Sequence, residues 1–109
     1  MKNSMQANQI LSEGIQILKA RATKRDTNAE RSMKVIVDTF NAAFNKNMSE
    51  AEGWAFMLIL KLIRSRTGKF DPDDHIDGAN YFALYGEAKS NEDYKQKQCT
   101  TTNDSMDCE

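Results

Sequence analysis

The chain contains few of the features that mark specialised classes of protein. Its 109 residues include one proline, one histidine and two cysteines. No apolar run approaches the roughly 20 residues that a membrane-spanning helix needs, so we expect no membrane partner. The net charge of −1 gives no basic surface as a whole, which argues against nucleic acid as a partner. The N-terminal letters MKNSMQANQ lack the apolar core of a secretory signal, which favours a cytoplasmic protein.

The two cysteines do not form a recognisable site. Cys99 and Cys108 both lie in a polar C-terminal stretch, and no second pair of ligands indicates zinc. A disulfide between them would close only a short polar loop. We therefore expect reduced thiols without a structural role, as is usual in cytosolic proteins.

Apolar residues recur at the three-and-four spacing of amphipathic helices, and no segment shows the alternation of a strand. This periodicity predicts four helices, at about residues 4–22, 28–45, 50–67 and 72–89. The sequence therefore predicts a small all-α domain over residues 1–90, followed by a polar disordered tail over residues 91–109. Short links make successive helices antiparallel neighbours.

Local signals mark several helix ends. Ser49 stands three residues before Glu52, the capping-box spacing in which each side chain accepts a hydrogen bond from a free backbone N–H. Thr27 and Glu30 have the same spacing before the second predicted helix. Gly68 is placed to end the third helix in the left-handed conformation.

The third predicted helix contains WAFMLILKLI, which is apolar almost all round. A helix of this kind is buried on several sides, so we expect the third helix to be the buried, central one. Lys61 and Arg64 interrupt the apolar surface three residues apart, and hence on one face. The surplus of apolar surface also makes a homodimer a candidate assembly.

Four aspartates surround the start of the fourth predicted helix. Asp71 precedes Pro72, and proline is favoured at the first helical position. Asp73 and Asp74 then fall in the first turn, where the helix dipole favours negative charge by about 0.3–1 kcal/mol each. Asp77 lies a full turn deeper, and the chemistry of a helix start does not explain it.

A polar stripe runs along the fourth predicted helix. Its members are Asp73, Asp77, Asn80 and Tyr81. Antiparallel packing against the third helix brings Lys61 and Arg64 to the two carboxylates of this stripe. One interpretation is an ion-pair network that fixes the register of the helices and binds no ligand. The other is a nucleotide or phosphate site, in which the carboxylates share Mg²⁺ and the cations contact phosphate. The spacing leaves both interpretations open.

Three further candidates have structural explanations of their own. Glu30 and Arg31 open the second helix and are the remaining polar candidates for the seam. We interpret Glu30 first as a capping residue, and the alternative is a metal ligand. His75 has no Ser or Cys nucleophile placed to use it, so we expect an exposed side chain. The basic residues 19–25 lie at a helix C-terminus, where cations are favoured without a nucleic acid.

Several motifs resemble a family of small phage and prophage proteins of unknown function. They are ERSM (30–33), FNAAFN (40–45), EGWAFMLILKLIRS (52–65) and GKFDPDDHIDGANYFALYGE (68–87). More remotely, the chain is similar to phage domains associated with nucleotide modification and to MazG-type nucleoside triphosphate pyrophosphatases. That resemblance implies Asp73 and Asp77 as metal ligands and Lys61 and Arg64 as phosphate contacts. The chain departs from the MazG pattern, because Glu30 has no partner glutamate and the later motif is D-x-x-x-D.

Two functional hypotheses follow. In the first, the chain is a phage or prophage accessory protein that binds a host or phage protein through an apolar helical face, without catalysis. This hypothesis predicts an apolar patch on the folded surface and no pocket beside Asp77. In the second, the chain binds or hydrolyses nucleotides with Mg²⁺, which predicts a concave polar pocket there. The sequence leaves open whether the chain is an enzyme and whether it has a cofactor.

Overall fold

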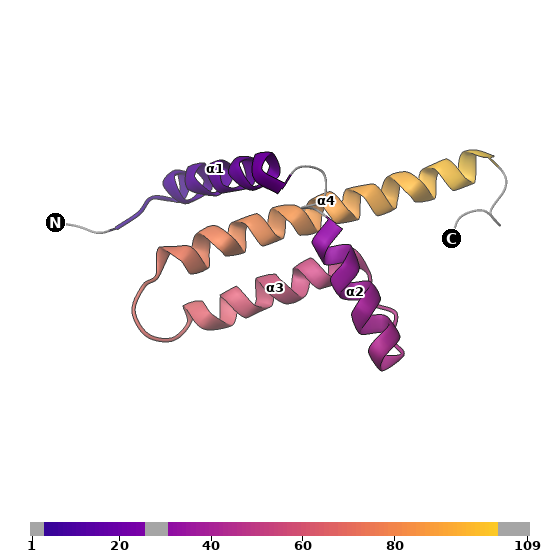
Figure 1. Cartoon of the computed structure of the whole chain (residues 1–109). Coiled ribbons are helices and arrows are strands. Elements are labelled where there is room, and N and C mark those ends of the chain that lie inside the picture. The colour runs from indigo at the N-terminus through magenta and orange to yellow at the C-terminus, as the bar shows by residue number, and fades with distance from the viewer. Residues whose placement is uncertain (1–3, 26–30, 103–109) are drawn as a thin grey trace.

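The computed structural model consists of four α-helices and confirms the all-α fold (Figure 1). It describes residues 4–25 and 31–102, of which residues 22–25, 31 and 97–102 are described by their backbone alone. No strand occurs in these two ranges. The helices are α1 (Ala7–Arg25), α2 (Arg31–Phe44), α3 (Glu50–Ser65) and α4 (Pro72–Thr102).

The longest helix, α4, organises the others around its first half. Figure 1 shows α1 and α3 along opposite sides of α4, with α1 parallel to it and α3 antiparallel. The second helix, α2, crosses α3 steeply near the start of α3 and extends away from the other helices. The radius of gyration is 17.0 Å, whereas a compact chain of this length has about 13 Å. The molecule is therefore elongated, and its helices cover one another only in part.

The ends of α3 and α4 are built as their sequences predict. Ser49 and Glu52 form the predicted capping box, with each side chain accepting a hydrogen bond from the backbone N–H of the other. After α3, Gly68 adopts the predicted left-handed conformation with φ of 74°. Asp71 accepts a hydrogen bond from the backbone N–H of Asp73 at 3.1 Å, which caps α4. The other predicted capping box, Thr27 with Glu30, lies outside the described residues.

A pair of hydrogen bonds holds the link between α2 and α3. The Asn41 amide donates to the carbonyl oxygen of Met48 at 2.9 Å and accepts from the Met48 N–H at 2.8 Å. Between them Asn45 ends α2 with φ of 55°, a conformation that asparagine tolerates better than most residues. The two helices then pack closely at Gly53, which is buried against Met33 and Val37 of α2.

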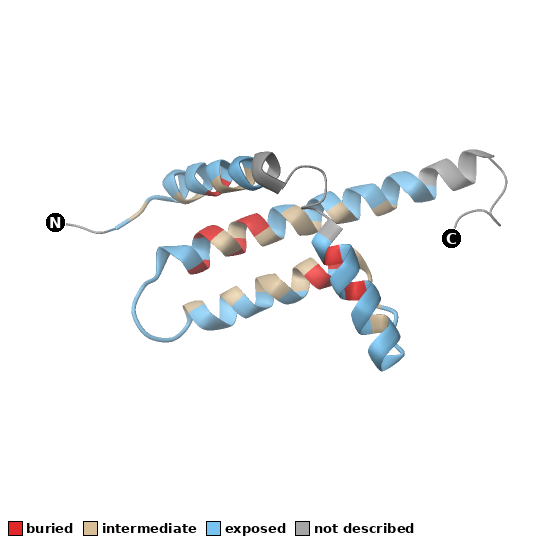
Figure 2. Cartoon of the chain, viewed as in Figure 1, coloured by how far each residue is buried: buried red, intermediate tan, exposed pale blue. Residues whose placement is uncertain are grey.

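The fully formed core is small (Figure 2). The buried hydrophobic residues among those described are Met33, Val37, Ala51 and Ile76. Flanked by α2 and α4, α3 takes the position expected of a central helix, but its burial within one chain is partial. Ala51 and Gly53 are buried, while Phe56 is 64% exposed and Ile59 is 55% exposed. The apolar perimeter of α3 is thus wider than the surface that α2 and α4 cover.

The fourth helix is longer than the sequence periodicity predicts. It continues past residue 90, the expected start of the tail, and ends at Thr102. Residues 91–102 carry no apolar stripe, yet several of them are good helix formers, and extending an existing helix avoids the cost of nucleating a new one. Of the expected tail over residues 91–109, the part beyond Thr102 lies outside the described residues.

No helix in the described part of the chain combines the length and apolar character that crossing a membrane requires.

The contact at Gly53 gives a test of how α2 is held. A side chain there would collide with the Met33 sulfur and come within 2.9 Å of Val37 Cγ1. We expect Gly53→Val to lower the free energy of unfolding by about 1–3 kcal/mol, because α2 must move away from α3. Urea denaturation followed by circular dichroism measures the loss.

The same substitution at Gly86 is the matched control, since a Cβ atom there meets nothing within 4 Å. We expect Gly86→Val to leave stability unchanged or slightly raised, because valine has a better helix propensity than glycine. An equal loss in both variants would show that helix propensity, and not the contact with α2, decides the effect.

Candidate functional site

The predicted seam between α3 and α4 exists, and its centre is one ion pair. Lys61 Nζ lies 3.2 Å from Asp77 Oδ2, with side chains that are 13% and 24% exposed. Both residues lie where the helices approach closely, because a Cβ atom on Gly78 would come within 3.7 Å of Lys61 Cβ. The prediction that Lys61 meets Asp77 is therefore confirmed.

The second cation of the seam meets a different carboxylate from the one expected. Arg64 Nε lies 3.7 Å from Asp74 Oδ1, whereas Asp73 is exposed. Successive residues of a helix point about 100° apart, so only one of these two neighbours can face α3. Asp74 takes that position and is 7% exposed. Its Oδ1 atom has no hydrogen-bond donor in the structure, because 3.7 Å is too long for a hydrogen bond to Arg64.

The two remaining members of the polar stripe have packing roles. Asn80 is buried under α1, where a Cβ atom on Gly14 would come within 2.6 Å of Asn80 Oδ1. Gly14 therefore permits the close approach of α1 and α4. Tyr81 stacks on Trp54 of α3, with 5.9 Å between ring centroids and 25° between the ring planes. This contact joins α3 and α4 beside the ion pair.

The other candidates lie away from the seam or outside the description. Glu30 falls outside the described residues, and the side chain of Arg31 at the start of α2 is among those not described. The Cys99 side chain and all of Cys108 are likewise not described. His75 is exposed, as expected, and stacks on Phe70 with 5.1 Å between ring centroids.

The cations of the seam are paired with carboxylates across α3 and α4. Lys61 and Arg64, the two cations that would contact phosphate, are each paired with a carboxylate of α4. In the residues for which side chains are described, no three His, Cys, Asp or Glu side chains gather closely enough to hold a metal ion. This pairing is the arrangement that the first interpretation of the sequence requires, in which ion pairs fix the register of the two helices.

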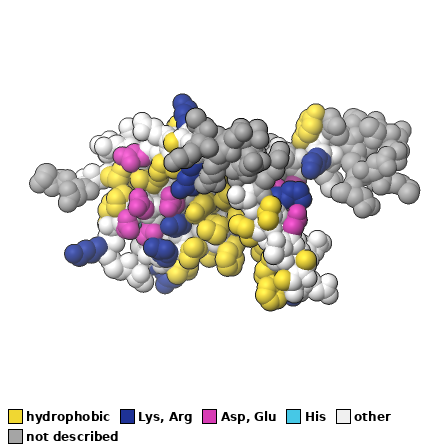
Figure 3. Space-filling model, viewed as in Figure 1, with side chains coloured by type: hydrophobic (Ala, Val, Ile, Leu, Met, Phe, Trp, Pro, Cys, Tyr) yellow, Lys and Arg dark blue, Asp and Glu magenta, His cyan; other side chains and the backbone are white. Residues whose placement is uncertain are grey.

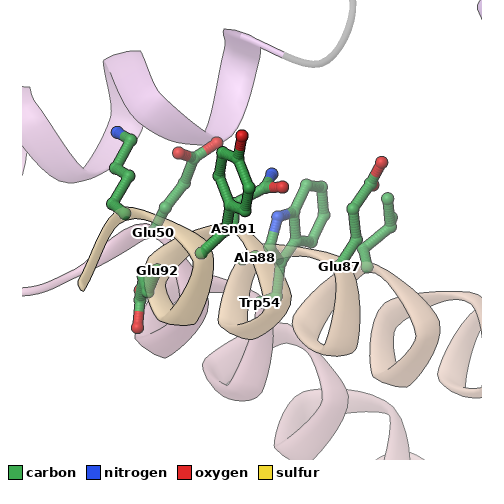
Figure 4. Close-up of a pocket in the computed structure, with 9 residues that line it drawn as sticks. Glu50, Trp54, Glu87, Ala88, Asn91 and Glu92 are labelled. Atoms are coloured by element: carbon green, nitrogen blue, oxygen red, sulfur yellow. The ribbon is translucent and has the colours of Figure 1, made fainter. Parts of the chain in front are cut away.

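A pocket of about 320 Å³ lies further along α4, beside the start of α3 (Figure 4). Its lining residues are Glu50, Trp54, Leu84, Glu87, Ala88, Asn91, Glu92, Tyr94 and Lys95. Neither Lys61 nor Asp77 contributes to it. The sequence did not indicate this pocket, because the residues beyond position 90 were expected to form a tail.

One part of the described surface is rich in exposed apolar side chains. Figure 3 shows hydrophobic side chains gathered over α3 and along the side of α2 that faces it. We define the apolar face as seven exposed residues: Ile36, Phe40, Phe44, Phe56, Ile59, Leu60 and Ile63. The α2 residues and the α3 residues both adjoin the contact at Gly53, because Phe56 follows Gly53 by three residues and Phe40 follows Val37 by three. The face is therefore continuous across the crossing of α2 and α3.

The ion pair of Lys61 and Asp77 can be tested by its effect on stability. We expect Asp77→Ala to cost about 1–3 kcal/mol, because it leaves a largely buried ammonium without a partner. A double variant, Lys61→Met with Asp77→Leu, should recover most of the loss, because apolar side chains can fill the same space. Chemical denaturation of the three proteins measures these changes.

The control is the pair of Lys34 and Asp38 on α2, whose side chains are 63% and 59% exposed. Asp38 accepts a hydrogen bond from Lys34 and raises the pKa of that ammonium, but solvent screens the pair. We expect no resolvable change in stability for Asp38→Ala. A loss as large as that of Asp77→Ala would contradict a special role for the seam.

Comparisons with known proteins give one result. A search of the curated proteins and a search of the solved structures each find no match. A family model matches residues 9–89, a range that includes the seam and the whole apolar face. The same range ends before Asn91, so one end of the pocket falls beyond it. Because the match covers most of the 109 residues, the chain belongs to the family described as a domain of unknown function (DUF6378).

Proposed function

We propose that the chain is a non-enzymatic helical protein-interaction module, and that the apolar face is the surface that binds its partner. The observation that carries the proposal is the exposure of seven large apolar side chains on one continuous surface of α2 and α3. Soluble monomers rarely leave so large a contiguous apolar surface open to water, and such surfaces usually mark interaction sites.

The composition of the face suits a protein partner. Phe40 and Phe44 pack together with 5.0 Å between ring centroids and stand at the exposed end of α2. Aromatic side chains are common anchors of protein interfaces, because they bury a large area with few rotatable bonds. The opposite side of α2 carries the ion pair of Lys34 and Asp38, which suits a solvent-facing surface. An amphipathic helix of this kind can lay its apolar side into a groove of a partner.

The biological setting is part of the proposal. The motifs ERSM, EGWAFMLILKLIRS and DDHIDGANY resemble small phage and prophage proteins. We therefore place the module among phage or prophage accessory proteins, with a phage or host protein as the partner in the cytoplasm of the host cell.

The Mg²⁺-dependent nucleotide site is the weaker alternative. It would require Lys61 and Arg64 to leave their carboxylates and bind phosphate, while Asp73 and Asp77 bind the metal ion. Breaking the largely buried pair of Lys61 and Asp77 carries a desolvation cost that the ligand would have to offset. The pocket lies elsewhere on α4, beside Trp54.

Ligand-induced thermal shifts separate the two functions. We expect no rise in melting temperature when the protein is heated with millimolar Mg²⁺ and a panel of nucleoside triphosphates, because a ligand that does not bind the folded state cannot stabilise it. A rise that requires Mg²⁺ and disappears in Asp77→Asn would support the alternative and contradict a purely binding role.

The interaction itself is tested in cells that carry the phage or prophage. A tagged chain at native expression level should elute from gel filtration of the extract at a mass above that of a monomer. Phe44→Glu should shift it to the monomer position, because a carboxylate placed on the apolar face must be desolvated when the complex forms. The double variant Lys61→Met with Asp77→Leu should keep the larger mass. If the wild type elutes as a monomer, or if Phe44→Glu changes nothing, the proposed function is wrong.

A further inference from the structure

We propose that the partner on the α3 part of the apolar face is a second copy of this chain, and that the two α3 helices pair antiparallel about a two-fold axis. The inference rests on the proposed function, since it names the partner of the same surface. Three features support it: the spacing of the exposed stripe, the exposure of its side chains, and the charges at the two ends of α3.

The stripe has the spacing of a helix–helix interface. Phe56, Ile59, Leu60 and Ile63 follow the i, i+3, i+4, i+7 pattern and are exposed. They lie on the side of α3 away from α4, because Trp54 and Lys61 make the contacts with α4. A helix that is apolar on two opposite sides needs a neighbour on each, and the described part of the chain supplies α4 on one side.

The exposure of the stripe favours a permanent partner. Phe56 is 64% exposed, Ile59 is 55% exposed and Ile63 is 48% exposed. A standard interface covers roughly 800 Å² of each partner, and obligate homodimers cover more. Among the described residues no large side chain is fully buried. A chain with so small a core gains much of its stability from assembly, which is the situation of obligate homodimers.

The charges at the ends of the stripe select the antiparallel orientation. Glu52 lies four residues before Phe56, and Arg66 lies three residues after Ile63. The two charged residues therefore mark opposite ends of the stripe, at similar distances from its centre. Both are exposed. A two-fold axis between Ile59 and Leu60 brings Glu52 of each copy to Arg66 of the other, and the same surface serves both copies. Parallel pairing would set Glu52 against Glu52 and Arg66 against Arg66.

The α2 part of the face adjoins this pairing. Because α2 crosses α3 at Gly53, next to Phe56, the antiparallel arrangement sets α2 of each copy beside the last turns of the α3 helix of the other. Phe40 and Phe44 then extend the interface outward along α2.

The experiment measures the mass of the purified full chain by analytical ultracentrifugation between 1 and 100 µM, with both cysteines changed to serine to exclude disulfide-linked species. The protein with these two changes alone is expected to be a dimer over this range, with a melting temperature that rises with protein concentration. Ile59→Glu is expected to weaken dimerisation at least 100-fold, because it places two carboxylates near the two-fold axis. Leu62→Glu is the matched control: Leu62 is 59% exposed on the same helix but outside the stripe, and its substitution should leave the dimer intact.

A second set of variants keeps the test valid if Ile59→Glu does not fold. Arg66→Glu is expected to weaken the dimer on the order of tenfold. The reason is that the new carboxylate at position 66 of each copy then faces the Glu52 carboxylate of the other copy. Glu52→Arg alone also removes the hydrogen bond that the Glu52 side chain accepts from Ser49, so it is measured as the reference. The double variant should dimerise more tightly than either single variant, which a pairing of the two positions predicts. Arg21→Glu makes the same charge change on α1, beyond α4 from α3, and should have no effect.

A monomer at 100 µM would overturn the inference, as would charge variants that do not rescue each other. The proposed function would survive that result if Phe44→Glu still removed the larger complex from cell extracts, because the partner would then be a different protein. Conversely, a pure dimer and no other partner in extracts would restrict the function to self-association.

Discussion

The constraint on which the rest of this structure depends is the apolar perimeter of α3. One side of the helix packs on α4 through Trp54, Leu58 and the stem of Lys61. Near its start a second side packs on α2 at Gly53. On a further side, Phe56 is 64% exposed, Ile59 is 55% exposed and Ile63 is 48% exposed. Exposed apolar surface is unfavourable in proportion to its area, so this side of α3 favours burial against a partner.

Glycine and polar residues hold the few helix–helix contacts that the chain does make. Gly14 lets α1 approach Asn80, and Gly53 lets α2 approach α3. The pair of Lys61 and Asp77 then sets how far α3 and α4 slide along each other, because a shift by one turn would separate the charges by about 5.4 Å. Contacts of this kind determine position more than they add stability, since a buried ion pair gains little over apolar packing. The fold is therefore well defined in register while it remains poor in buried apolar area.

The features that sequence analysis predicted are those that depend on near neighbours in the chain. Capping by Ser49 and Glu52, the left-handed Gly68 and the pairing of Lys61 with Asp77 follow from spacings within one helix or across one short turn. The choice of Asp74 over Asp73 as the partner of Arg64 depends on how the link between α3 and α4 rotates one helix about its axis. Periodicity does not contain that rotation. Periodicity also identifies an apolar side of α2. It does not show that α3 covers Met33 and Val37 on that side while Phe44 stays exposed.

The proposed dimer would reconcile the expectation of a buried third helix with the observed exposure of α3. Side chains that are buried in an assembly leave the same apolar pattern in a sequence as side chains that are buried within one chain. Within one chain, α3 lies between α2 and α4 as a central helix does, but one of its sides remains exposed. A second α3 packed on Phe56, Ile59, Leu60 and Ile63 would place each copy between its own α4 and the other chain. The all-round apolar character of WAFMLILKLI would then reflect quaternary structure, and the charged seam on its other side would hold each half in the correct register for that pairing.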